Sequence, residues 1–228
     1  MNIFCNYILY FIIYSIIGWL IEVMSFLVQD KKFVNRGFLI GPICPIYGYG
    51  VILIILIIGT DKTDLLSMFL KSIFICSILE YSTSFIMEKL FKARWWDYSQ
   101  RRFNINGRIC LETMLPFGIG ATIVLYFVHP LVIKLVDMLS YNPKLIIAMV
   151  LLVIYLVDNF ISMAVMNKIK KQIKKQKADN TIEIRKKVSI WMNENSYWYR
   201  HIKSAFPKFK IIDRVKKIKD VIIPTKKM

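Results

Sequence analysis

Long apolar runs are the feature that most restricts what this chain can fold into. The residues from Ile3 to Ile21 carry no charge, and the apolar character continues to Val28. Another run, Leu145–Met166, is interrupted only by Asp158. A helix of about 20 apolar residues is long enough to cross the hydrocarbon core of a bilayer. These runs predict an all-α membrane protein.

The composition of the whole chain agrees with a membrane location. Of its 228 residues, 56% are hydrophobic, and the mean hydropathy is +0.49. Both values are too high for a soluble domain of this length. The first run lacks the basic start, the short apolar core and the small-residue cleavage site of a signal peptide, so we expect it to be retained as the first span.

We expect five transmembrane helices, of which the last is Leu145–Met166. The second run, residues 37–60, begins with several glycines and prolines, so only Gly48–Gly59 is expected to form its helical core. The third, Leu65–Met87, contains two charged residues, but many apolar side chains would be stranded if it faced water. The fourth span is expected at Thr113–Ile133.

The basic residues are distributed unevenly along the chain. The formal net charge is +17, and the residues from Lys168 onward hold 19 of the 32 Lys and Arg and 5 of the 15 Asp and Glu, a net charge of +14. We therefore divide the chain into a transmembrane domain, residues 1–167, and a basic tail, residues 168–228. Lysines alternate with bulky apolar residues in the tail, which is typical of amphipathic helices on a membrane surface; a solvated helical hairpin is the alternative.

The position of these charges predicts the partners and the orientation. A basic tail tethered to apolar spans favours the anionic lipids of the inner leaflet, and no nucleic-acid partner is expected. Basic residues also follow the first span at 31–36 and surround the third loop at 89–108. With five spans, all three basic segments lie on one face, which the positive-inside rule makes cytoplasmic. The N-terminus is then outside and the C-terminus cytoplasmic.

A pattern in the first two spans recurs in the third and fourth. Because two spans separate the copies, the copies would run in the same direction, as a parallel repeat of a two-helix unit. Chance similarity is the alternative. The corresponding segments are Glu22-x-x-Ser25-Phe26 and Glu80-x-x-x-Ser84-Phe85, Asn35-Arg36-Gly37 and Asn106-Gly107-Arg108, and Pro45-Ile-Tyr-Gly48 and Pro116-Phe-Gly118.

Charged residues in or beside the spans are candidates for a binding site, because burying a charge in a bilayer is costly. At about 1.5 Å of rise per residue, three carboxylates lie about 9 to 15 Å from the cytoplasmic ends of their helices. Arg108 lies one turn before Glu112 if the fourth helix already runs there. We predict an inward-facing polar cavity that binds a cation, a proton or a headgroup; ion pairs that fix the helices are the alternative. The candidate residues are Glu22, Arg36, Glu80, Arg108, Glu112 and Asp158.

The loop between the third and fourth spans is the longest polar segment between apolar runs. Its arginines and paired indoles are typical of a membrane–water interface. We expect it to anchor the protein at that interface and to be available to a partner. The residues concerned are Trp95, Trp96, Asp97, Tyr98, Arg101 and Arg102.

Familiar catalytic and metal-binding motifs are missing from the sequence. It has no Walker A sequence, no G-x-S-x-G and no H-E-x-x-H. The four cysteines form no C-x-x-C pair, and there are two histidines, so no metal and no cofactor are expected. The sequence favours transport over catalysis.

Five segments carry a resemblance that covers nearly the whole chain: Gly18-Trp19 with Glu22, Asn35–Gly50, Trp96–Ser99, Phe103–Leu111 and Ala205–Pro207. They resemble the bacterial family of type IV ABC-transporter permeases. The resemblance implies a small multi-pass protein of the bacterial plasma membrane. As a transporter component, it would offer the loops 30–36 and 89–108 to a separate cytoplasmic ATPase subunit.

Two other functions are left open. A membrane enzyme or accessory protein could act on lipid headgroups, with Arg36 and Arg108 binding phosphate and Glu22, Glu80 or Asp97 as acid–base groups. A scaffold that docks other membrane proteins through its basic tail is the third interpretation. The substrate and the oligomeric state, a homo-oligomer included, are also left open.

Overall fold

The computed structural model describes residues 2–59, 64–91, 93–175, 181–206 and 210–211, and most of them are helical. The helices are α1 (Asn2–Asp30), α2 (Pro45–Ile58), α3 (Leu65–Phe91), α4 (Leu111–Ile123), a π-helical turn η1 (Val124–Val128), α5 (His129–Asp137), α6 (Tyr141–Lys175), α7 (Thr181–Glu194) and α8 (Tyr197–Ala205). Four short strands, β1 (Ala93–Arg94), β2 (Asn104–Ile105), β3 (Ile109–Cys110) and β4 (Lys210–Ile211), form the antiparallel pairs β1–β4 and β2–β3.

Four helical segments are long and apolar enough to cross a membrane. They contain the predicted first, third, fourth and fifth spans, so the multi-pass helical architecture is confirmed. The segment that contains the predicted fourth span joins α4, η1 and α5 end to end, and its π-helical turn comes just before Pro130, which has no N–H to donate to the helical ladder. The predicted second span is the short helix α2, whose 14 residues extend about 21 Å. A fifth crossing therefore stays a prediction.

The chain between α1 and α2, residues 31–44, is not helical and runs back along α1. We call it the connecting segment. The backbone N–H of Cys44 donates to the carbonyl oxygen of Ser15 at 2.9 Å, so α2 begins beside the middle of α1. Asp158 of α6 accepts the N–H groups of Ile40 at 3.0 Å and Gly41 at 2.8 Å. These partners accept hydrogen bonds that the irregular backbone of the connecting segment cannot make within a helix. Non-helical backbone at the depth of a bilayer needs such partners, because no water is available there.

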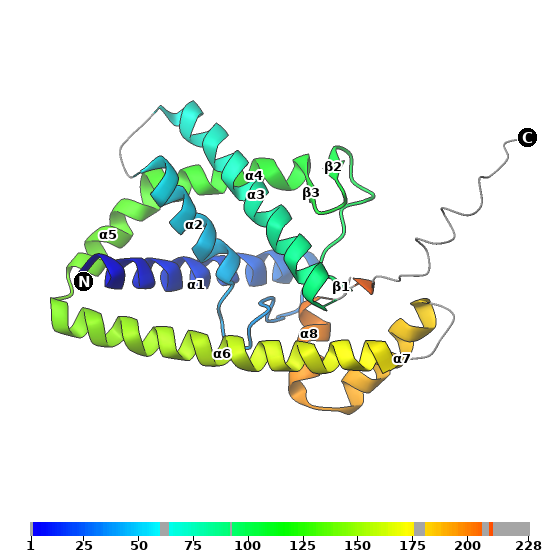
Figure 1. The fold of residues 1–228 in the computed structure, drawn as a ribbon. Coiled ribbons are helices and arrows are strands. Elements are labelled where there is room, and N and C mark those ends of the chain that lie inside the picture. The colour runs from blue at the N-terminus through cyan, green and yellow to red at the C-terminus, as the bar shows by residue number, and fades with distance from the viewer. Residues whose placement is uncertain (1, 60–63, 92, 176–180, 207–209, 212–228) are drawn as a thin grey trace, which may run out of the picture.

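Two glycines allow the helices to pack in pairs. A Cβ atom at Gly48 of α2 would collide with the Ser15 side chain of α1, and one at Gly118 of α4 would collide with Ile73 of α3. Small residues at such contacts let two helix backbones approach closely, as is common in membrane helix packing. The chain is thus organised as an α1–α2 pair and an α3–α4 pair, with α6 lying along α1 (Figure 1).

The described part of the tail is mostly helical and folds back onto the spans. Apolar residues of α7 and α8 join a buried cluster with α3, α6 and Trp95; the cluster contains Phe91, Trp95, Val165, Met166, Ile169, Val188, Met192, Tyr199 and Ile202. One face of the tail therefore contacts protein, as a packed helical hairpin does. Its binding to anionic lipid stays a prediction, and residues 176–180, 207–209 and 212–228 lie outside the described residues.

The elements between and after the spans gather at one end of the helices. Figure 1 shows β1, β2, β3, α7 and α8 at that end, and the N-terminus with α5 at the other. Contacts link the connecting segment to α8 there: His201 Nε2 donates to the Leu39 carbonyl oxygen at 3.1 Å, and the Arg36 guanidinium donates to the Ala205 carbonyl oxygen. This end of the molecule holds the candidate site.

Candidate functional site

A cavity of about 420 Å³ lies where the connecting segment, the loop 92–110 and α8 meet the spans. We call it the polar chamber. Two carboxylates, one guanidinium and several aromatic rings line it. Its lining includes Glu22, Arg36, Cys44, Tyr47, Glu80, Trp95, Trp96, Tyr98, Phe117, Tyr155, Asn159 and Phe206.

Glu22 of α1 is held from two sides in the polar chamber. The Tyr47 hydroxyl of α2 donates a hydrogen bond of 2.7 Å to Glu22 Oε1, and Arg36 Nε lies 3.9 Å from Glu22 Oε2. The Arg36 guanidinium also lies over the Phe26 ring, 4.9 Å from its centroid. Because Arg36 also bonds to Ala205, it ties α1 to α8 across the end of the chamber.

Glu80 of α3 has no comparable cation. It is 6% exposed, and it accepts a hydrogen bond from the side chain of Tyr98. Its Oε2 atom has no hydrogen-bond partner, and no basic side chain among the described residues forms an ion pair with it. A buried carboxylate oxygen without a partner is costly, so this position calls for a proton or a cation.

Tyr98 reaches Glu80 from the loop 92–110. Its backbone N–H donates to the Gly107 carbonyl oxygen at 2.8 Å, and the neighbouring Trp96 indole donates to the Arg108 carbonyl oxygen at 2.9 Å. Burial, and then the negative charge of Glu80, raise the pKa of the Tyr98 hydroxyl above its ordinary value. The hydroxyl therefore remains a neutral donor.

The paired indoles of this loop face the protein. Trp95 is 4% exposed, and its ring packs against Phe206 with 4.4 Å between centroids and against Phe38 at 5.6 Å. Trp96 is half-buried and lines the polar chamber. The predicted roles of the loop as anchor and partner surface are not tested by these contacts, but its outermost arginines, Arg101 and Arg102, are exposed.

Arg108 lies in a separate ion-pair network. Its Nη2 atom is 2.9 Å from Glu88 Oε2, which also lies 2.9 Å from Arg94 Nη2, and Arg94 in turn lies 3.3 Å from Asp97. The Arg108 guanidinium, 8% exposed, also lies over the Phe85 ring at 5.3 Å. The structure thus joins the loop 92–110 to α3 through Arg108 and does not bring Arg108 to Glu22 or Glu80.

The remaining two candidates occupy different places. Glu112 pairs with Arg101 at 2.9 Å on the surface, where both side chains are more than half exposed. Asp158 accepts the two backbone N–H groups of the connecting segment and the Ser162 hydroxyl at 3.1 Å. Of the six predicted residues, the structure gathers Glu22, Arg36 and Glu80 in one chamber and disperses the others.

Several chamber residues escaped the sequence analysis. Tyr47 was within reach, because it directly precedes Gly48 as Phe117 precedes Gly118, and the two ring centroids are 6.2 Å apart. Phe206 was also within reach, since it belongs to the motif Ala205–Pro207 in an otherwise basic tail.

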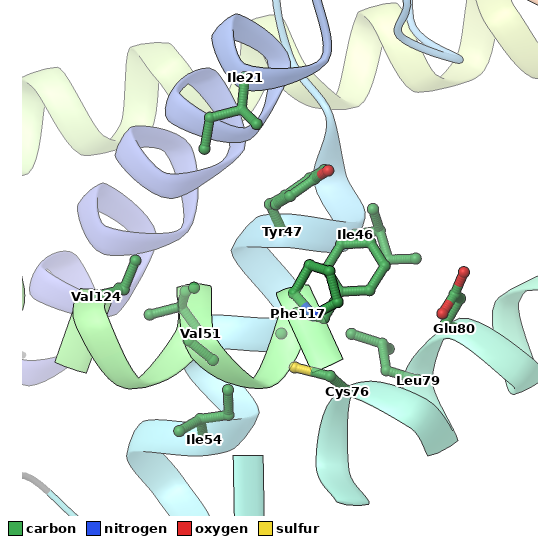
Figure 2. A pocket seen from close by; sticks show the side chains of 14 residues that line it. Ile21, Ile46, Tyr47, Val51, Ile54, Cys76, Leu79, Glu80, Phe117 and Val124 are labelled. Atoms are coloured by element: carbon green, nitrogen blue, oxygen red, sulfur yellow. The ribbon is translucent and has the colours of Figure 1, made fainter. Parts of the chain in front are cut away.

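A second pocket, of about 270 Å³, adjoins the chamber and is lined almost entirely by apolar side chains (Figure 2). We call it the apolar pocket. Ile46, Tyr47, Glu80 and Phe117 line both cavities. In Figure 2, Glu80 lies at one margin, whereas Val51, Ile54 and Val124 lie farther from it. A ligand in the chamber would therefore have apolar space beside its polar contacts.

Comparison with known proteins identifies the family. Neither the curated proteins nor the solved structures include a significant match to the chain. A sequence model of the family described as "Putative ABC-transporter type IV" matches residues 9–163, which is more than half of the chain and includes most of every predicted span. The chain belongs to this ABC-transporter family.

Proposed function

We propose that the chain is the membrane-spanning permease component of an ABC-type transporter and that the polar chamber is its inward-facing substrate site. The observation that carries the proposal is Glu80, a buried carboxylate with one oxygen unpartnered in a cavity of about 420 Å³. Ionisable groups in such positions mark substrate and ion pathways in membrane proteins. The family to which the chain belongs supports transport over other uses of this site.

In this proposal, α2 and the connecting segment together make one crossing, which gives five spans. The connecting segment covers the half of α1 beyond Ser15, and α2 covers the other half, as the Cys44–Ser15 hydrogen bond indicates. A half-helix preceded by irregular backbone is a common way to build a site near the middle of a bilayer.

The orientation follows from the basic residues. The arginines of the connecting segment and of the loop 92–110 lie at the end of the helices that also holds α7 and α8 (Figure 1). The positive-inside rule makes this the cytoplasmic end, so the N-terminus is outside and the chamber faces the cytoplasm of a bacterial cell. The basic tail is then available to anionic lipid.

The proposal includes a parallel duplication of a two-helix unit. Gly48 contacts Ser15, seven residues before Glu22, and Gly118 contacts Ile73, seven residues before Glu80. Arg36 lies over Phe26, and Arg108 lies over Phe85, as the proposed correspondence of the two halves requires. These matching contacts support the duplication independently of the sequence similarity.

The alternative enzymatic function has less support. It required Arg36 and Arg108 as phosphate binders, but Glu88 neutralises Arg108, and Asp97 is occupied by Arg94 and the Ser99 backbone N–H. An acid–base pair would have to be built from Glu22 and Glu80 alone. A scaffold function has no contact that favours it.

Mild-detergent purification from the native membrane, followed by mass spectrometry, tests the proposal. We expect a cytoplasmic ATPase in stoichiometric amount. The double variant Arg101→Glu/Arg102→Glu should release it, because both side chains are exposed on the loop proposed as its docking surface. The matched control is Lys186→Glu/Lys187→Glu, which changes the same charge on α7. A chain that purifies without an ATPase from membranes in which it is active would contradict a role in an ABC-type transporter.

A further inference from the structure

We propose that the polar chamber and the apolar pocket bind one amphiphile, with a protonated amine or quaternary ammonium head in the chamber and a slender apolar chain in the pocket. The proposal deepens the transporter function above and rests on it, since it names the class of substrate. Three features of the cavities support it, namely their charge, their aromatic lining and their connection.

The charge of the chamber favours a cationic head. Glu22, Glu80 and Arg36 are the charged residues that line it within the described part of the chain, so one negative charge is left over. Arg36 lies 3.9 Å from Glu22, whereas no basic side chain in the part of the chain that the structure describes pairs with Glu80. An anionic head would add to this imbalance, whereas an ammonium head would remove it by pairing with Glu80. A protonated amine would in addition donate a hydrogen bond to Glu80 Oε2.

The aromatic lining favours an organic cation over a metal ion. Tyr47, Trp95, Trp96, Tyr98 and Phe117 surround the carboxylates, and aromatic faces attract ammonium groups within about 6 Å. A hard metal cation needs about six oxygen ligands. Among the residues that the structure describes, no three His, Cys, Asp or Glu side chains are grouped closely enough to hold a metal.

The adjoining cavity favours a chain on the cation. The apolar pocket shares four lining residues with the chamber, so a molecule whose head is at Glu80 can extend past Phe117 toward Val124 (Figure 2). Its volume of about 270 Å³ exceeds the cavity of about 150 Å³ that holds benzene in a lysozyme variant. A small amine without a chain would leave this apolar surface uncovered.

Scintillation proximity binding on the full-length protein in phosphatidylcholine nanodiscs tests the inference, with empty nanodiscs to subtract partitioning. The probe is radiolabelled decyltrimethylammonium. We expect saturable binding that decyl phosphate and decyl maltoside do not displace at tenfold excess, and that tetramethylammonium displaces only at about hundredfold higher concentration. If decyl phosphate displaces the labelled probe as well as the unlabelled probe does, the proposal that the site prefers a cationic head is wrong. Equal potency of tetramethylammonium and the probe would overturn the chain.

Two variants locate the site. Glu80→Gln should weaken probe binding by about thirtyfold or more, because it removes the carboxylate that pairs with the head. Glu112→Gln, the same change in an exposed ion pair, should leave it unchanged. Ala121→Leu narrows the apolar pocket and should weaken the probe about tenfold but not tetramethylammonium. Equal binding by wild type and Glu80→Gln would contradict the site, and the ligand series on the wild-type protein decides the class without any variant.

The outcomes separate this inference from the proposed function. If an ATPase co-purifies but the chain shows no saturable probe binding, the transporter function is supported and the proposed substrate class is contradicted. If the chain binds the probe saturably through Glu80 but purifies without an ATPase, the amphiphile site is supported and the ABC-type transporter function is contradicted.

Discussion

The α1–α2 and α3–α4 pairs each have a carboxylate in the polar chamber and an arginine nearby, but the two arginines pair with different residues. In the first pair, Arg36 lines the polar chamber and lies 3.9 Å from Glu22. In the second, Arg108 is buried 2.9 Å from Glu88 and does not reach Glu80. In the first half, the arginine therefore pairs with the chamber carboxylate, Glu22. In the second half, it pairs with Glu88, another carboxylate of the helix that carries Glu80.

Glu88 of α3 accounts for the difference. It lies three residues after Phe85, over whose ring Arg108 lies, and it pairs with that arginine. The ion pair of Arg36 is with Glu22. Among the described residues, Glu80 therefore has no basic partner. The excess negative charge of the chamber thus comes from an acidic residue outside it.

Breaking the Glu88 network should produce the largest effect. Glu88→Gln leaves the Arg108 guanidinium buried without its carboxylate and removes one of the two carboxylates that pair with Arg94. Removing one member of a buried pair typically costs about 3 to 5 kcal/mol, and we expect a loss near that size in the free energy of unfolding. Thermal unfolding in detergent, with the midpoint compared between variant and wild type, measures it. A midpoint within 2 °C of the wild type would mean that Arg108 does not depend on Glu88.

Removing the tyrosine that donates to each chamber carboxylate sharpens the comparison. Tyr47→Phe deletes the 2.7 Å hydrogen bond to Glu22, and Tyr98→Phe deletes the one to Glu80. A hydrogen bond to a charged group is worth about 1.5 to 3 kcal/mol, so both variants should lose stability in that range. If Glu80 is ionised, Tyr98→Phe should cost at least as much, because Arg36 still supports Glu22. Chemical denaturation in matched micelles compares the two, and a negligible cost for Tyr98→Phe would indicate a Glu80 that is already protonated.

The helices could be predicted from the sequence because apolar runs and charges are local properties. The connecting segment could be predicted in part, since the glycines and prolines among residues 37–47 indicate an irregular entry to the second run, but the partners of that backbone could not. Its stability depends on Asp158, which lies more than a hundred residues away in the sequence. Such a partner is invisible to a sequence pattern.

Only part of the chamber could be predicted, because the sequence shows local charges but not which distant residues they contact. Glu22, Arg36 and Glu80 stood out as charges in or beside apolar runs. Arg108 and Glu112 were grouped because a helix spacing joins them, but the helix begins at Leu111 and the preceding residues form β3. Because the two residues before α4 form a strand and not a helical turn, Arg108 faces α3 and pairs with Glu88 and not with Glu112.

The pH dependence of the contact between α8 and the connecting segment tests how much His201 contributes to holding α8 in place. Burial lowers the pKa of His201 below its ordinary value of 6.5, although hydrogen bonds to the connecting segment and the Asp158 charge act in the opposite direction. The neutral ring donates to the Leu39 carbonyl oxygen. Because the folded pKa is the lower one, the stabilisation is present above pH 6.5 and is lost as the pH falls through the folded pKa.

Hydrogen exchange of residues 197–206 measures this docking. We expect faster exchange at pH 5.5 than at pH 7.5 after correction for the intrinsic rate. In His201→Gln, which cannot titrate, the corrected rates should be equal at the two pH values. The same acceleration in both proteins would assign the effect to another group.

The surface pair Arg101–Glu112 should give the smallest effect and so defines the background for the others. Its two side chains are 62% and 54% exposed, and water screens an ion pair of that kind. Glu112→Gln should therefore change the free energy of unfolding by less than about 0.5 kcal/mol. The same chemical change at Glu88 is expected to cost several times more, because there the guanidinium left behind is buried. Equal costs for the two variants, in one denaturation series, would show that burial does not distinguish the two networks and that the asymmetry of the halves has another origin.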